Sequence, residues 1–355
     1  MLADPPGMDD RSRSSQGRQQ FSPGTAMRRR TSSRALCVFC HLDFCPSTCV
    51  DSASRWNLTL AALKDVAKLA AYFIATLLVG ALAAPTLFWS AQSLAAHGVF
   101  SFLARNDFET FFHRALLVAA VLLLWPFLRV SHVRRMTDLG LGPNPRWDRD
   151  LFAGAVISVV PLLCCGALLV AFHIYSFRHS FAWSRFGKML VASITVPFIE
   201  ETFFRGIVLG VLLRTGRKYI AIFSVSVIFA AVHFLKAPER TSQIVTWTSG
   251  FSSIAHAFDG IGDPMMVAFA LATLFCIGWI LADARVLTHS LWLSIGLHAG
   301  WIFSSGAFSR LARQQTLAFP WIGKSMLVGI IPLGVAALTW VIMRIWLKYG
   351  RASQV

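Results

Sequence analysis

Charged side chains are scarce in this sequence. Only 14% of its 355 residues are Asp, Glu, Lys or Arg, whereas 55% are hydrophobic, and the mean hydropathy is +0.59. A soluble domain of this length has too small an interior to bury so much apolar surface, which excludes a soluble globular protein. The chain is therefore predicted to be an integral membrane protein.

The long apolar runs also lack the strict alternation of apolar and polar residues that marks the strands of a membrane β-barrel. Several runs instead reach the roughly 20 residues that an α-helix needs to cross the hydrocarbon core. We predict an all-α, polytopic bundle of about eight transmembrane helices. The expected spans are 69–89, 114–130, 151–173, 189–213, 218–235, 264–283, 286–305 and 325–346.

A secretory signal is also missing, because the first long apolar run is of spanning length and lies far from Met1. Residues 1–56 are polar, lack apolar periodicity and are predicted to be disordered. Two interpretations of their cysteine cluster stay open, a small metal site or a start codon assigned too far upstream, with Met27 as an alternative start. The cluster comprises Cys37, Cys40, His41, Cys45 and Cys49.

Cysteine is otherwise confined to apolar runs. Cys164, Cys165 and Cys276 are predicted to be small core residues. Nothing in their placement predicts a disulfide.

Basic residues outnumber acidic ones, 33 to 17, which gives a formal charge of +16. They gather at 129–149, 214–218 and 344–351, and Lys and Arg beside short loops favour the cytoplasmic face. We therefore expect a multi-pass protein of a bacterial inner (plasma) membrane with both termini in the cytoplasm. Attraction to anionic lipid explains the positive charge, and no nucleic-acid partner is predicted.

The stretch "VPFIEETFFRGIVLG" places Glu200, Glu201 and Arg205 inside an expected span. Ionisable groups at membrane depth are costly, so they face the protein interior and are commonly functional. Glu201 and Arg205 are four residues apart and can pair on one helix face, whereas Glu200 is rotated by about 100°. One interpretation is that the acids only neutralise the arginine; the other is that Glu200 is a catalytic base supported by Glu201 and Arg205.

Two histidines lie in other expected spans, His233 in "VIFAAVHFL" and His298 in "SLWLSIGLHAGWIF". Each alone is compatible with a packing residue. Together with Glu200 they are expected to meet around a polar intramembrane cavity, since charged groups at this depth must line protein or water. Such a cavity suits peptide hydrolysis. Glu200 would deprotonate water, His233 would hold that water or share its proton, and His298 would donate to the oxyanion.

Three short patterns resemble the successive motifs of the CAAX prenyl protease and bacteriocin-processing (CPBP) family of intramembrane endopeptidases. They are EETFFR at 200–205, FAAVH at 229–233 and LHAGW at 297–301, and "LGLGPNPRWDRDLFAG" is similar to the family's lead-in. The resemblance covers roughly residues 150–310. It implies Glu200 and His233 as the pair that activates water, Glu201 and Arg205 as their support, and His298 as an oxyanion donor.

One position departs from the family pattern. Ile302 stands four residues after His298, where the family has Asn or Asp. Isoleucine cannot donate a hydrogen bond, so the oxyanion site is either weaker here or completed by another group. Trp301, whose indole N–H can donate, is one candidate; a packing or interfacial role is the other interpretation.

The resemblance leaves metal use open. A mechanism without a cofactor is favoured because the H-E-x-x-H helix is absent. The alternative is a Zn²⁺ ion held by Glu200, His233 and His298.

The chain is predicted to divide into an N-terminal extension (1–56), N-terminal helices with a basic loop (57–149), a CPBP-like protease core (150–310) and a C-terminal helix with a basic tail (311–355). Residues 237–263 are interpreted either as an ordinary long loop or as a cover over the cavity. The expected substrate is a membrane-associated or lipidated polypeptide. The alternative function is a proton-coupled carrier or an immunity-type partner, although no convincing repeat between halves favours a carrier.

Overall fold

The computed structural model describes residues 48–179, 183–234, 244–256 and 263–352. Ser52–Val355 forms one unit, and the other unit, Met1–Asp51, lies almost entirely outside the described residues. The predicted cysteine cluster at 37–49 and the alternative start at Met27 therefore fall where no side chain is described. The domain divisions predicted within 52–355 stay predictions.

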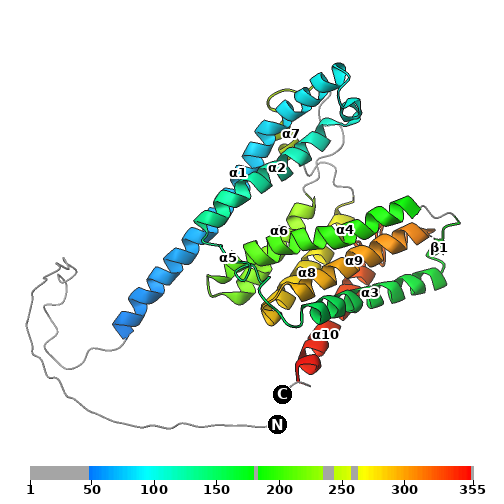
Figure 1. Cartoon of the computed structure of the whole chain (residues 1–355). Helices are drawn as coiled ribbons and strands as arrows, with labels where there is room; N and C mark the ends of the chain where they lie inside the picture. Colours follow the sequence, from blue (N-terminus) through cyan, green and yellow to red (C-terminus); the bar gives the residue numbers. More distant parts are fainter. Residues whose placement is uncertain (1–47, 180–182, 235–243, 257–262, 353–355) are drawn as a thin grey trace, which may run out of the picture. The chain divides into compact units, whose positions relative to one another are not determined.

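The described chain is a helical bundle (Figure 1), so the predicted all-α class is confirmed. Five described helices are long and apolar enough to cross a membrane, and the chain is a multi-pass integral membrane protein. They are α1 (Thr48–Ala96), α2 (Phe108–Val130), α3 (Trp147–Ala171), α8 (Pro264–Thr288) and α10 (Ile330–Ala352). The other expected spans correspond to α4 (Trp183–Glu201) continued by the π-helix η2 (Thr202–Val208) and α5 (Leu209–Leu213), to the shorter α6 (Lys218–Phe234), and to α9 (Trp292–Leu311).

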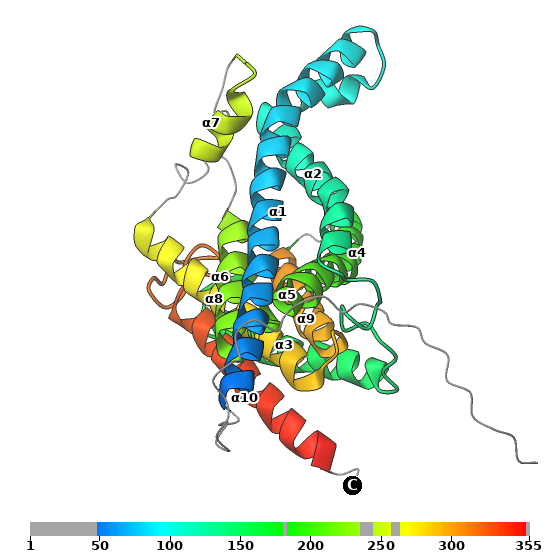
Figure 2. The ribbon, with the colours of Figure 1, turned by 90° about the vertical axis from the view of Figure 1, so that its left-hand side faces the viewer.

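Helices α1 and α2 run alongside each other (Figures 1 and 2), joined by the short 3₁₀ helix η1 (Ser101–Arg105). The Tyr72 hydroxyl donates to the Ala120 carbonyl at 2.9 Å, and its ring packs on Phe127. Near one end of this pair, Arg214 bridges Asp65 of α1 (2.9 Å) and the Ser131 carbonyl after α2 (2.8 Å). These polar contacts join the α1–α2 pair to the end of α5.

Among the described helices, α3 and α9 make the most extensive contact, and small residues allow it. A Cβ atom on Gly296 would overlap the Leu151 carbonyl, and one on Gly300 would overlap Ser158 and the Ala155 backbone. Without hydrophobic attraction between helices in lipid, such close backbone approach supplies the van der Waals contact that holds them together. This packing fixes the depth and rotation of α9.

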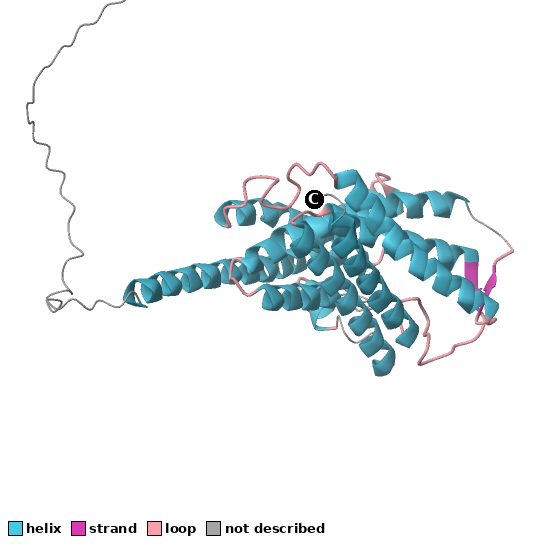
Figure 3. Ribbon diagram, turned by 90° about the horizontal axis from the view of Figure 1, so that it is seen from below, coloured by secondary structure: helices cyan, strands magenta, loops and turns pink. Residues whose placement is uncertain are grey.

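The predicted span at 286–305 is wrong at its start. The structure continues α8 to Thr288, turns at His289 with φ 56°, and begins α9 only at Trp292. The apolar run hides this turn because it continues through it. A two-stranded antiparallel pair, β1 (Tyr175–Phe177) with β2 (Ala312–Gln314), was also not predicted; it connects the segments that follow α3 and α9 (Figure 3).

The described part of the predicted cover forms α7 (Ser249–Ala255). This helix packs on α1, where a Cβ on Gly250 would overlap the Ala81 carbonyl, and Trp247 meets Trp89 edge-on at 4.7 Å. None of the described residues of this segment lines the cavity that contains Glu200, His233 and His298. The structure thus gives the described part of the segment a docking contact with α1.

Candidate active site

The charged turn lies where α4 passes into the π-helix η2. Glu200 and Glu201 end α4, and Arg205 lies within η2. Short π-helical insertions are rare and frequently occur at functional sites. The predicted pair forms, because Arg205 Nη1 donates to Glu201 Oε1 at 2.8 Å and both side chains are fully buried.

Arg205 is held on several sides. Its Nη2 donates to the Gly278 carbonyl of α8 at 3.3 Å, and its guanidinium lies 4.3 Å from the centre of the Phe229 ring. Burying two charges is costly, and breaking such a pair usually costs more than it contributes when intact, about 3–5 kcal/mol. The pair therefore anchors α4 and η2 to α6 and α8.

Glu201 also orients His298. Its Oε1 lies 2.8 Å from Nδ1 of His298, whose side chain is 8% exposed. Because a carboxylate paired with a guanidinium acts as an acceptor, Nδ1 carries the proton in this contact. The second ring nitrogen, Nε2, is left to face Glu200, with 3.9 Å between Nε2 and Glu200 Oε2.

His233 approaches Glu200 from α6. Its Nδ1 donates to the Phe229 carbonyl at 2.8 Å, since a carbonyl only accepts, and its Nε2 lies 3.7 Å from Glu200 Oε2. Glu200 Oε2 is buried and receives no hydrogen bond from the described residues. Distances of 3.7 and 3.9 Å exceed a direct hydrogen bond and suit bridging by one water molecule.

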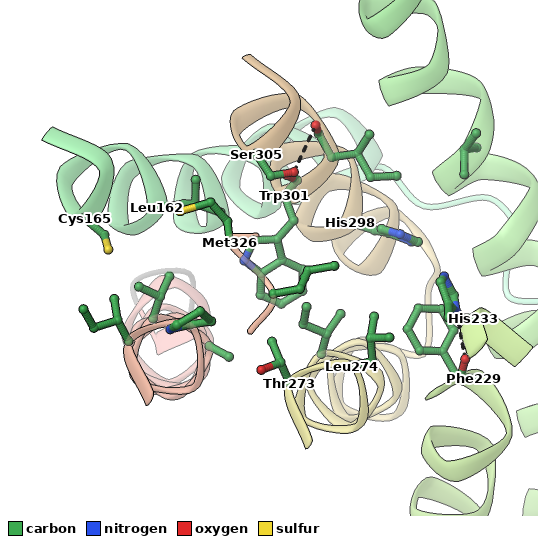
Figure 4. Close-up of a pocket in the computed structure, with 18 of the residues that line it drawn as sticks. Leu162, Cys165, Phe229, His233, Thr273, Leu274, His298, Trp301, Ser305 and Met326 are labelled. Carbon is green, nitrogen blue, oxygen red and sulfur yellow. Dashed lines mark hydrogen bonds between the residues drawn. The ribbon is translucent and has the colours of Figure 1, made fainter. Parts of the chain in front are cut away.

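These three groups line one cavity of about 290 Å³. Figure 4 shows His233 and His298 at one side of it, with the Trp301 ring projecting into the space beside them. The remaining wall is mostly apolar and comes from α3, α4, α6, α8, α9, α10 and the segment before α10. Its members include Leu162, Cys165, Leu274, Ile277, Met326, Ile331, Pro332, Val335 and Ala336.

The structure thus brings together all five residues predicted from the sequence, with different surroundings for each acid. The Glu201 side chain is 0% exposed, whereas those of Glu200 and His233 are 27% and 31% exposed. The buried Glu201 and Arg205 can therefore hold the site together from within the protein. Glu200 and His233 are exposed enough to contact a molecule in the cavity. General acid–base chemistry requires such reach, directly or through one water.

Ile302 and Trp301 both line the cavity. The apolar Ile302 side chain therefore occupies a wall position where an amide could have donated. Sequence reasoning missed Ser305, which lies seven residues after His298 on the same helix face and also lines the cavity. Ser305 donates to the Trp301 carbonyl at 2.7 Å. The small residue Gly278, whose carbonyl binds Arg205, and the wall from α10 were also missed.

The zinc alternative, in which Glu200, His233 and His298 bind the ion, stays a prediction. Zinc ligands lie about 2.0–2.2 Å from the ion, so three donor atoms must converge on one point. Within the described ranges, no group of three or more His, Cys, Asp or Glu side chains is arranged so that it could hold a metal ion.

Residues 182–304 match the model of a protein family described as type II CAAX prenyl endopeptidase Rce1-like. The matched segment contains the charged turn and both histidines. Over this segment the chain is similar to the CAAX prenyl protease and bacteriocin-processing family that its sequence motifs resemble. Comparison with curated proteins and with solved structures gave no significant match.

Proposed function

We propose that this protein is an intramembrane endopeptidase that hydrolyses a peptide bond in a membrane-associated or lipidated polypeptide, CAAX-type substrates included. The family match supports protease activity at the level of the family. The observation that carries the proposal is the convergence of Glu200 with two imidazole Nε2 atoms, at 3.7 and 3.9 Å, on the wall of a largely apolar cavity.

In the proposed reaction, Glu200 accepts a proton from a water molecule held between its carboxylate and His233 Nε2. The resulting hydroxide attacks the peptide carbonyl, and the carbon–nitrogen bond breaks as Glu200 returns the proton to the leaving amine. His298 is bonded to Glu201 through Nδ1, so it donates to the oxyanion from Nε2 when doubly protonated. Preorganised donors of this kind lower the barrier by a few kcal/mol.

The test compares membrane proteomes of cells that carry the intact protein, Glu200→Gln or the control Asp148→Asn. Asp148 is an exposed carboxylate at the start of α3 and lies outside the cavity. We expect a precursor polypeptide to accumulate only with Glu200→Gln, because an amide cannot accept the proton from water. The purified protein should then cleave that precursor, and full activity after chelation would leave zinc out of the mechanism.

An unchanged proteome with a folded Glu200→Gln variant would contradict the proposal. A transport or partner-binding defect without proteolysis would then favour a carrier or an immunity-type partner. Folding of the variant is checked by thermal unfolding in detergent, compared with Asp148→Asn.

A further inference from the structure

A second cavity, of about 290 Å³, lies outside the candidate active site. It is bounded by the lead-in to α3, the last turn of α8 and the last turn of α10. Its wall comprises Asn144, Pro145, Arg146, Arg149, Asp150, Thr288, Trp346 and Gly350. Three transmembrane helices thus end around it, which places it at a membrane–water boundary.

Aromatic residues support that placement. Trp147, 48% exposed, packs on Trp292 at 5.2 Å, and Trp346 lines the cavity itself. Tryptophan and tyrosine gather at the headgroup level of membranes, because their rings are apolar and their N–H or O–H groups are polar. The cavity therefore opens at the depth where lipid headgroups lie.

The charges on the wall favour an anion. Arg149 is partly buried, and its Nη2 donates a hydrogen bond to the Gly350 carbonyl at 3.0 Å. Its guanidinium lies 5.7 Å from the centre of the Trp346 ring. The Arg146 guanidinium makes no hydrogen bond or ion pair within the described residues. Asp150, the acidic residue of the wall, accepts from Asn144 at 3.1 Å. The wall therefore carries the guanidinium groups of Arg146 and Arg149 and the carboxylate of Asp150, which already accepts a hydrogen bond from Asn144.

We propose that this cavity, which we call the Arg146 cavity, binds the phosphate group of an anionic membrane lipid. Guanidinium N–H groups match phosphate oxygens in geometry and charge. Basic pockets between transmembrane helices are suited to anionic headgroups, and the acyl chains would lie along the apolar flanks of the helices. This inference is independent of the proposed protease function.

The test is native mass spectrometry of the full-length protein in detergent, titrated with phosphatidylglycerol or with phosphatidylcholine of the same acyl chains. We expect phosphatidylglycerol to bind at least about tenfold more tightly than phosphatidylcholine. Arg146→Gln should weaken it about fivefold, and Arg146→Gln with Arg149→Gln about 30-fold, from the contribution of each basic residue near an anionic group.

Arg217→Gln is the matched control, since Arg217 is exposed and lies outside the cavity. Arg146→Gln is the decisive variant because its guanidinium makes no internal contact that folding would lose. Equal lipid binding by Arg146→Gln and Arg217→Gln would overturn the proposal, and so would equal binding of the two lipids. Inorganic phosphate at the concentration of the lipid should not displace it; displacement would assign the cavity to the free anion and overturn the lipid proposal.

Discussion

At the scale of single residues, the adjacent acids Glu200 and Glu201 have different surroundings. Glu201 is buried in the protein, where Arg205 and His298 both donate to its Oε1. Glu200 lies about one helical step of 100° away and lines the cavity. The spacing of four residues between Glu201 and Arg205 was sufficient to predict their pairing. The same rotation argument left Glu200 free to face elsewhere.

The position of Ile302 leads to a prediction at this scale. Because its side chain lines the cavity one turn after His298, Ile302→Asn introduces an amide donor there. We expect the turnover rate on the accumulated precursor to rise, by up to about 100-fold if the amide reaches the oxyanion. Ile331→Asn places the same amide elsewhere on the cavity wall and is the control. An unchanged rate in a folded Ile302→Asn variant would show that another group already completes the oxyanion site.

Which residues converge could be predicted from the sequence, but their hydrogen bonds could not. Intramembrane Glu200, His233 and His298 stand out because ionisable groups are costly in lipid. The tautomer of His233 depends on the Phe229 carbonyl, which lies four residues earlier in the chain. The tautomer of His298 depends on Glu201, which is 97 residues away in the sequence and a neighbour only in space. Gly278 gives no sequence signal, since it acts through its backbone carbonyl.

At the scale of helices, the α3–α9 contact sets the position of His298. We expect Gly296→Leu to destabilise the protein by about 3 kcal/mol or more, because overpacking at a backbone contact forces the helices apart. Thermal unfolding in detergent measures this loss. Gly334→Leu in α10 is the control, since a Cβ there meets no atom within 4 Å. Equal stability of the two variants would mean that the contact can relax without cost.

Hydropathy identified where helices lie but not how they are interrupted. The π-helix η2 follows α4 without any break in the apolar run, so its altered hydrogen bonding leaves no periodic signal. The turn at His289 was missed for a similar reason. The π-helix contacts α6 and α8 through Arg205, and the segment after His289 is bonded to the loop before α3 through Leu291 and Ser290. A single sequence contains no direct record of those contacts.

At the scale of the molecule, the number of crossings determines the side of each terminus. Five described helices are long and apolar enough to cross, and the sequence predicts that α4–η2–α5, α6 and α9 also cross, for an expected total of eight. An even number returns the chain to its starting side. From the basic clusters we propose that both termini lie in the cytoplasm.

Fusions to either end test this topology in a bacterial host. We expect green fluorescent protein to be fluorescent at both termini, and alkaline phosphatase, which needs an oxidising compartment, to be inactive at both. Alkaline phosphatase inserted after Gln315 should be active, because that position lies on the expected outer side between α9 and α10. Opposite results at the two termini would require one of the segments not to cross.

Helix α10 contributes cavity wall but none of the predicted reacting groups. The acid and both imidazoles belong to α4, α6 and α9, whereas Ile331, Val335 and Ala336 come from a helix beyond the segment that matches the family. Substitutions in α10 can therefore change the shape of the cavity while Glu200, His233 and His298 keep their positions.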